Sequence, residues 1–304
     1  MSEITTGRRG ALGELHPDTE ARQYCPIGTT HTVRGGGRLQ LHVREWGNPE
    51  GPPILFIHGW SQNHLCWTKQ IDSPLAQEFR LVALDNRGHG MSDTPLEAEH
   101  YTDPQRWADD IAAVINALRL NRPALVGWSY GGFIICDYLR AYGQAAIAGI
   151  NFVGGAVTLG ERAFGTFIGP GFFEPFPGAT AADLPTNIAA IRGFLRGVFH
   201  TQPSQDDFEV ALCCNIVVPT EVRAALAQRE IASDDVLSTL EVPVLVTHGC
   251  HDDVVLPAMA RHILRTCPTA EPSWYPDAGH APFMEDPGRF NAELAAFVRV
   301  AAAS

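Results

Sequence analysis

The stretch from Leu125 to Gly132 constrains the fold of this chain more than any other part of its sequence. Residues 124–126 are apolar and predict a buried strand, and apolar residues at helical spacing after the stretch predict a helix. The chain must therefore turn abruptly between the two elements. Ser129 stands at this turn, with Gly127 two residues before it and Gly131 two residues after it.

This Gly-x-Ser-x-Gly pattern is typical of a nucleophile elbow, in which the turn lifts the serine hydroxyl clear of the sheet. Small residues are needed at Gly127 and Gly131 because a side chain at either position would collide across the turn. The backbone N–H of Tyr130 is then expected beside the hydroxyl, at a helix N-terminus that favours negative charge. The alternative is a turn that only connects a strand to a helix, and the rest of the chain decides between them.

Four further motifs accompany the elbow, in a fixed order along the chain. They are Phe56-Ile57-His58-Gly59-Trp60, the loop Asp85 to Ser92, Thr247-His248-Gly249 followed by Asp252, and Gly279-His280. Together with the elbow they resemble the α/β-hydrolase superfamily over about residues 30 to 300, and within it the capped serine esterases, lactonases and cofactor-free haloperoxidases.

The apolar pattern agrees with the α/β fold that this resemblance implies. Residues 54–58, 81–84 and 147–153 predict further buried strands, and residues 107–118 predict an amphipathic helix. Strands that alternate with helices predict a mostly parallel sheet flanked by helices. Two β-prone runs around Gly35 to Gly37 predict a hairpin ahead of the parallel strands.

The strand–helix rhythm stops after Gly154 and resumes at the strand of residues 242–248. Helical patterns are expected between, at about residues 188–199, 205–213 and 220–232, so the resemblance implies an inserted helical cap. We therefore predict a core of residues 29–154 and 241–304, a helical cap of residues 155–240, and a loosely ordered arm of residues 1–28.

The resemblance implies an acyl-enzyme mechanism with the Ser129 hydroxyl as nucleophile, His280 as base, and the backbone N–H groups of Trp60 and Tyr130 as oxyanion donors. Asp85 and Arg87 are expected to hold loops together rather than to take part in the chemistry. His89 precedes the elbow and is not expected to be the base. His64 lies in a polar loop near the site and is expected at the surface.

The carboxylate is the ambiguous member of the set. Asp252 lies three residues beyond Gly249, as the family pattern requires, and Asp253 is the next residue. Asp277 lies three residues before His280 and is more plausible as a turn former. We assign Asp252 as the acid, with Asp253 as the alternative.

Aromatic residues are expected to form part of the substrate pocket. Trp128 stands inside the elbow, and a run of phenylalanines opens the predicted cap, where most rings are expected to anchor the cap to the core. We predict that Trp128, Phe164 and Phe167 contact substrate.

The composition of the chain limits the classes of molecule that it is expected to bind. The chain has 304 residues and a formal net charge of -12, which argues against nucleic acid and anionic membranes as partners. No apolar run is long enough to span a bilayer, and the polar first 20 residues do not resemble a secretory signal. Seven scattered cysteines without ligand spacing predict reduced thiols in a cytoplasmic protein and no metal site or cofactor.

A serine at the elbow excludes relatives that use aspartate there, such as haloalkane dehalogenases and epoxide hydrolases. The most common activity among the remaining relatives is hydrolysis of a small to medium, largely apolar carboxylic ester or lactone. Perhydrolysis or haloperoxidase activity and C–C bond hydrolysis use the same triad and remain alternatives. A non-catalytic ligand receptor on the same fold is an alternative of a different class, disfavoured because the whole catalytic set is present.

Overall fold

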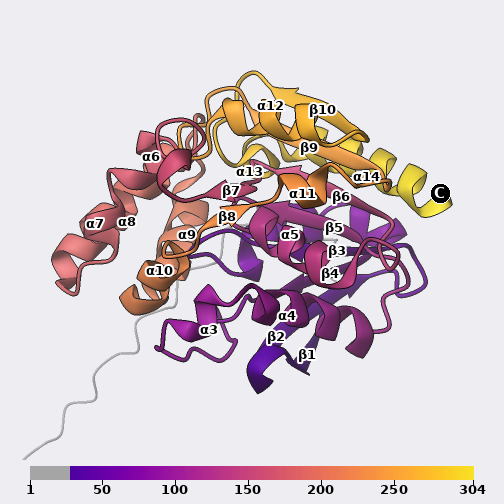
Figure 1. Ribbon diagram of the computed structural model, residues 1–304, viewed down its shortest axis with the longest axis horizontal. Coiled ribbons are helices and arrows are strands. Elements are labelled where there is room, and N and C mark those ends of the chain that lie inside the picture. The colour runs from indigo at the N-terminus through magenta and orange to yellow at the C-terminus, as the bar shows by residue number, and fades with distance from the viewer. Residues whose placement is uncertain (1–27) are drawn as a thin grey trace, which may run out of the picture.

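The computed structural model describes residues 28–304, so the arm predicted for residues 1–28 lies, except for Gly28, outside the described residues. Its centre is an eight-stranded sheet in the order β1-β2-β4-β3-β5-β6-β9-β10 (Figure 1). The strands are β1 (Thr29–Arg34), β2 (Gln40–Gly47), β3 (Pro53–Ile57), β4 (Arg80–Leu84), β5 (Ala124–Trp128), β6 (Gly149–Val153), β9 (Val244–Gly249) and β10 (Ala270–Tyr275). Strand β2 is antiparallel to both of its neighbours and the other pairs are parallel, which confirms the predicted α/β-hydrolase fold class.

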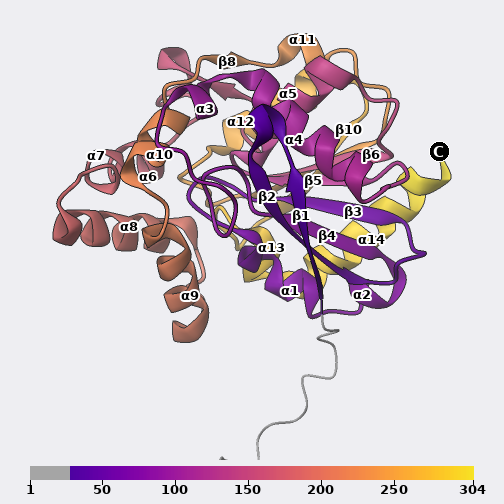
Figure 2. The ribbon, with the colours of Figure 1, turned by 90° about the horizontal axis from the view of Figure 1, so that it is seen from below.

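Helices cover both faces of this sheet (Figure 2). One layer contains α4 (Pro104–Ala117), α5 (Gly131–Tyr142) and α12 (Pro257–Thr266), and the other contains α1 (Thr68–Ile71), α2 (Leu75–Glu78) and α14 (Pro287–Ala303). The central strands β3, β5 and β6 are buried along their whole length because both faces are covered. This explains why the sequence shows continuous apolar runs there rather than alternation.

Local capping sets where the long helices begin. Asp103 accepts a hydrogen bond from the backbone N–H of Gln105 and is followed by proline, so α4 begins at residue 104. Asp286 does the same for α14 by accepting from the N–H of Arg289. The last helix therefore begins at Pro287, directly after its capping aspartate.

The segment between β6 and β9 contains short strands and most of the remaining helices. They are β7 (Thr158–Leu159), η3 (Glu161–Ala163), α6 (Pro170–Phe173), α7 (Phe176–Ala179), α8 (Leu184–Val198), α9 (Gln205–Ile216), α10 (Thr220–Leu226), β8 (Ile231–Ala232) and α11 (Asp234–Leu237). Helices α6 to α10 gather beyond one end of the sheet, whereas α11 packs on α5 and α12 (Figure 1).

The helix predicted for residues 220–232 is wrong in its second half. Helix α10 ends at Leu226, and residues 231–232 pair with β7 instead. Between them, the Arg229 guanidinium turns inward and donates to both carboxylate oxygens of Asp137, at 2.8 and 2.7 Å, where both side chains are buried. A buried carboxylate needs such a partner, so this contact overrides the helical pattern.

None of the helices within residues 28–304 combines the length and apolar character that a membrane crossing requires.

Candidate active site

Ser129 occupies the turn between β5 and α5 in a left-handed backbone conformation, with φ of 55°. This conformation is costly for a residue with a side chain and is common at functional sites. Glycine is required on both sides. A Cβ atom on Gly131 would lie 2.5 Å from the carbonyl oxygen of Ile57, and one on Gly127 would lie 2.6 Å from a methyl group of Ile135. The collision expected across the turn is present at Gly127, whose Cβ atom would also lie 2.9 Å from the backbone of Gly131, whereas the collision at Gly131 is with the neighbouring strand β3.

The loop after β3 approaches the same serine. A Cβ atom on Gly59 would lie 3.0 Å from the Cβ of Ser129, so the backbone next to Trp60 passes close to the hydroxyl. Within residues 28–304, no acceptor takes a hydrogen bond from the backbone N–H of Trp60 or from that of Tyr130. Both predicted oxyanion donors are thus free to bind a ligand atom beside Ser129.

His280 and Asp252 form a buried pair. The Nδ1 atom of His280 lies 2.7 Å from Oδ2 of Asp252. The other carboxylate oxygen, Oδ1, accepts the backbone N–H groups of Val254 and Val255, each at 2.9 Å. These bonds fix the carboxylate and, through it, the orientation of the imidazole.

The loop that carries His280 is attached directly to the elbow. The backbone carbonyl of His280 accepts the indole N–H of Trp128 at 2.9 Å, and the His280 backbone N–H donates to the carbonyl of Val198 at 2.7 Å. Ser129 donates its backbone N–H to the carbonyl of Val153. Gly154, the residue after Val153, lies against the imidazole of His280: a Cβ atom on Gly154 would be 3.0 Å from Nδ1 of that ring.

The structure distinguishes the three candidate aspartates by position. Asp253 and Asp277 are exposed and make no hydrogen bond to His280, whereas Asp252 is buried against it.

His248, at the end of β9, is a neighbour of this pair that belongs to the Thr247-His248-Gly249 motif but had no role predicted from the sequence. Its Nε2 atom lies 2.9 Å from the carbonyl oxygen of Val255 and 3.3 Å from Oδ2 of Asp252. Burial lowers the pKa of His248, so the imidazole is neutral and donates its Nε2 proton toward these oxygens. The sequence placed His248 four residues before Asp252, but an ordinary buried strand residue can occupy the same position, so the spacing did not predict this contact.

The remaining histidines near the elbow have structural partners. His58 Nε2 accepts the backbone N–H of Asn86, and His89 Nε2 accepts the backbone N–H of Ser61. Burial lowers the pKa of His58 to about 3 and the pKa of His89 to about 4. Both rings therefore stay neutral and hold the loop around Trp60.

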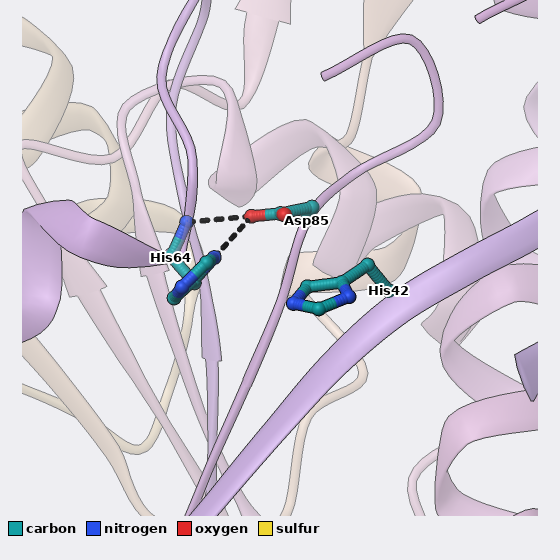
Figure 3. A group of neighbouring side chains, drawn as sticks. All are labelled: His42, His64 and Asp85. Atoms are coloured by element: carbon teal, nitrogen blue, oxygen red, sulfur yellow. Dashed lines mark hydrogen bonds and ion pairs between the residues drawn. The ribbon is translucent and has the colours of Figure 1, made fainter. Parts of the chain in front are cut away.

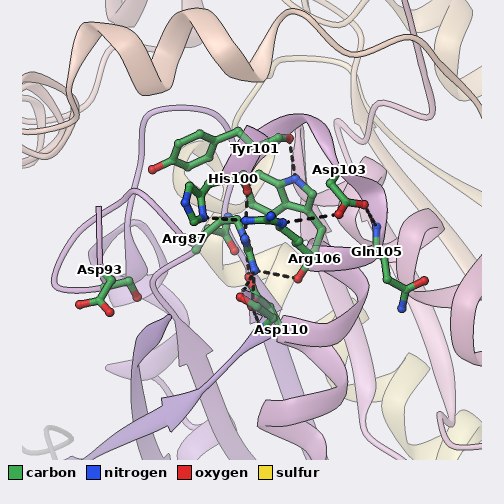
Figure 4. A network of polar contacts seen from close by, with 12 residues as sticks. Arg87, Asp93, His100, Tyr101, Asp103, Gln105, Arg106 and Asp110 are labelled. Carbon is green, nitrogen blue, oxygen red and sulfur yellow. Dashed lines mark hydrogen bonds and ion pairs between the residues drawn. The ribbon is translucent and has the colours of Figure 1, made fainter. Parts of the chain in front are cut away.

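Arg87, in the loop after β4, joins that loop to η1 (Gly36–Arg38), α3 (Glu99–Thr102) and α4 (Figure 4). Its guanidinium donates to both carboxylate oxygens of Asp110, at 2.7 and 2.8 Å, and to the backbone carbonyls of Gly36, His100 and Arg106. The position of Arg87 agrees with the loop-holding role expected from the sequence.

An apolar pocket opens at Ser129. Its lining residues are Trp60, Ser129, Tyr130, Phe133, Ala156, Leu159, Ile168, Phe172, Leu226, Ala227, Val254 and Val255. The cavity volume is about 30 Å³, room for about two water molecules.

None of the three predicted substrate contacts is among the residues that line this pocket. Phe164 is exposed by 43%, and Phe167 packs against the ring of His262 with 5.1 Å between centroids. Trp128 lines a separate cavity between α9 and the core. Of the phenylalanines in the segment between residues 155 and 240, Phe172 lines the pocket, and it packs edge-to-face on Trp60 with 5.3 Å between centroids.

Comparison with known proteins agrees with this geometry. The profile of the Alpha/beta hydrolase family matches residues 54–293. A Burkholderia cenocepacia protein assigned provisionally as an aryl esterase superposes with a TM-score of 0.85 at 39% identity, over 91% of this chain and 100% of that one. The esterase RhEst1 from Rhodococcus sp. ECU1013 superposes with a TM-score of 0.84 at 35% identity, over 89% of this chain and 98% of that one.

Among curated sequences, the non-heme chloroperoxidase of Streptomyces lividans is 28% identical over 285 residues, which are 90% of this chain and 100% of that protein. The family profile covers most of the described chain and includes the elbow, Asp252 and His280. This protein is a member of the α/β-hydrolase family.

Proposed function

We propose that this enzyme hydrolyses carboxylic esters of small molecules through an acyl-enzyme intermediate on Ser129. The observation that carries the proposal is the buried pair of His280 and Asp252 beside the strained serine turn. The similarity to two esterases over about nine-tenths of the chain supports the same activity.

Each residue has a defined part in the proposed reaction. His280 takes the proton of the Ser129 hydroxyl as its oxygen attacks the ester carbonyl carbon, and Asp252 stabilises the imidazolium that forms. The backbone N–H groups of Trp60 and Tyr130 bind the negatively charged carbonyl oxygen of the tetrahedral intermediate. His280 then returns the proton to the leaving alkoxide, and the C–O bond of the ester breaks.

Water completes the cycle. It loses a proton to His280 as it attacks the acyl carbon, and the second tetrahedral intermediate expels Ser129, which regains the proton. If hydrogen peroxide replaces water, the same step yields a peracid. The similarity to a chloroperoxidase makes this perhydrolysis the second candidate activity.

We propose that the apolar pocket binds the acyl group and that residues 155–240 form a cap that admits it. Several cap residues line the pocket, among them Phe172 and Leu226. Apart from the Ser129 hydroxyl, the side chains that line the pocket are largely apolar, so uncharged acyl groups of modest size fit its chemistry.

A fluorophosphonate probe tests the nucleophile. We expect one adduct, found by mass spectrometry on Ser129, and a loss of about 10⁴-fold or more in turnover of a chromogenic ester in Ser129→Ala. A folded wild-type protein that forms no adduct would instead support the non-catalytic receptor. An adduct on another serine would refute the assignment of Ser129.

A panel of esters, lactones and a peroxide-plus-halide assay then ranks the activities. Ester turnover well above halogenation is the expected result. The opposite order would make perhydrolysis the main activity while leaving the acyl-enzyme intact.

A further inference from the structure

A second cluster of polar side chains lies away from the proposed triad, where β2, β4 and the loop after β3 meet. His42 is on β2, Asp85 directly follows β4, and His64 begins the short helix η2 (His64–Trp67). Figure 3 shows the three side chains converging. One potential ligand atom from each residue lies within 4.8 Å of the other two.

The carboxylate at the centre of this cluster is fully buried and rigidly held. Asp85 Oδ1 accepts both the backbone N–H and the ring Nδ1–H of His64, each at 2.8 Å, and Oδ2 accepts the backbone N–H of Met91 at 2.9 Å. These contacts fix the carboxylate beside both imidazoles, where one of its oxygen atoms lies within 4.8 Å of a nitrogen atom of each ring.

The two imidazoles have nitrogen atoms to spare. The His42 ring makes no hydrogen bond to any residue within 28–304, and it lies 5.4 Å from the His64 ring between centroids. In His64, only Nδ1 bonds to Asp85, so Nε2 is not used in that contact.

We propose that His42, His64 and Asp85 bind a divalent transition-metal cation of borderline softness, such as Zn²⁺, Ni²⁺ or Cu²⁺. Two imidazoles and one carboxylate form a donor set that suits these ions, with water completing the coordination. Mg²⁺ and Ca²⁺ prefer sites made of oxygen ligands and are not expected to compete. The proposal is independent of the proposed ester hydrolysis.

The nearby charges set the strength of this site. The carboxylate of Asp85 attracts a cation, whereas the positive charge of Arg44 also reaches His42 and opposes one. The Arg44 guanidinium is held over the Trp46 ring at 5.2 Å and donates to the carbonyl of Gly28. Metal binding needs the ligating nitrogen of each imidazole to be unprotonated, so binding weakens in acid.

Occupancy of the site would cross-link three separate elements. His64 lies four residues after Trp60, whose backbone N–H is a proposed oxyanion donor. A metal that joins His64 to β2 and β4 would therefore fasten the end of that loop and raise the melting temperature.

The test titrates Zn²⁺ into the untagged, metal-stripped full chain by calorimetry, and Co²⁺ while recording visible absorption. We expect one equivalent bound in the micromolar range or tighter, nitrogen-ligated Co²⁺ bands, and a rise in Tm of about 3 °C at a tenfold excess over Kd. If the wild-type protein does not bind one equivalent of Zn²⁺ or Co²⁺, the proposal is overturned.

Variants locate the ion. His42→Ala removes a ring that makes no hydrogen bond, so the fold is expected to persist while affinity falls by about 100-fold or more. His64→Ala removes the second ring but keeps the backbone N–H that Asp85 accepts, and the same loss is expected.

The matched control is His251→Ala. His251 stacks on His200 with 3.9 Å between ring centroids, and this pair is the rival two-imidazole site. Binding that survives His42→Ala, or that disappears in His251→Ala alone, would refute the assignment.

Discussion

Replacing Asp252 with asparagine tests the proposed triad at the point where the geometry is tightest. In the wild-type chain, Oδ1 of Asp252 accepts the backbone N–H groups of Val254 and Val255, and Oδ2 lies 2.7 Å from His280 Nδ1. Asparagine keeps the volume, and its amide oxygen must face the two backbone donors. Its NH₂ group then faces His280, so Nδ1 has to accept a hydrogen bond instead of donating one.

This exchange places the ring proton of His280 on Nε2, the nitrogen that must accept the proton of Ser129. The same change in a serine protease lowers kcat by about 10⁴, which corresponds to about 5.5 kcal/mol in activation free energy. The substitution is also expected to reduce stability, because the Nε2–H of His248 points toward the same side of residue 252, with 3.3 Å between His248 Nε2 and Asp252 Oδ2 in the wild type. In the variant this N–H and the NH₂ group of the asparagine face each other as two buried donors, which is expected to lower the free energy of unfolding by about 1–3 kcal/mol.

The assay is the steady-state kcat of a chromogenic ester, with the pre-steady-state burst measured to separate acylation from deacylation. Urea unfolding of each variant shows whether the protein remains folded at the assay temperature. Asp253→Asn is the matched control because its side chain is exposed, and it is expected to stay within about twofold of wild type. A folded Asp252→Asn enzyme that keeps about a tenth of wild-type kcat, or a large loss in Asp253→Asn, would refute the reasoning.

Three further predictions follow from other parts of the molecule. Phe172→Ala enlarges the pocket and is expected to shift kcat/KM toward longer acyl chains by about tenfold, whereas Phe164→Ala, at an exposed ring, is expected to leave the chain-length preference unchanged. His58 has a pKa of about 3 in the folded protein, below its unfolded value of about 6.5, so its contribution to stability is fully present above pH 6.5 and is lost as the pH falls toward 3. Between pH 7 and pH 5 the free energy of unfolding is expected to fall by about 2 kcal/mol because of this residue. His58→Gln should remove this part of the pH dependence in urea unfolding. Gly131→Ala places Cβ against a backbone carbonyl and is expected to lower the free energy of unfolding by about 1–3 kcal/mol, while Gly193→Ala, in the open part of α8, is expected to raise it by about 0.5–1 kcal/mol. A stable Gly131→Ala protein would contradict the steric argument.

The strands and main helices of the core could be predicted because their signals are local. Burial on both faces makes β3 and β5 continuous apolar runs, and an aspartate followed by proline marks the starts of α4 and α14. Boundaries were less accurate where tertiary contacts compete with propensity. Strand β6 begins at Gly149 rather than at residue 147, and α10 ends before Arg229 reaches Asp137.

The elbow follows only in part from its own residues. The left-handed serine and the close approach of Gly127 to Gly131 are constraints within five residues, whereas the need for glycine at position 131 comes from the Ile57 carbonyl on the neighbouring strand β3. For the acid, the spacing that the resembled family shows after the strand-ending glycine favoured Asp252 over Asp253, and in the structure Asp252 is buried whereas Asp253 is exposed.

Tertiary structure alone decided which distant side chains meet. His248 beside Asp252, Phe172 rather than Phe164 in the pocket, and the cluster at Asp85 all join elements separated by loops or crossovers. The spacing of apolar and polar residues shows which face of a helix or strand is buried, but it does not show which residue of another element packs against that face. The packing partner depends on the order and twist of the sheet and on close packing between side chains, which exist only in the folded chain.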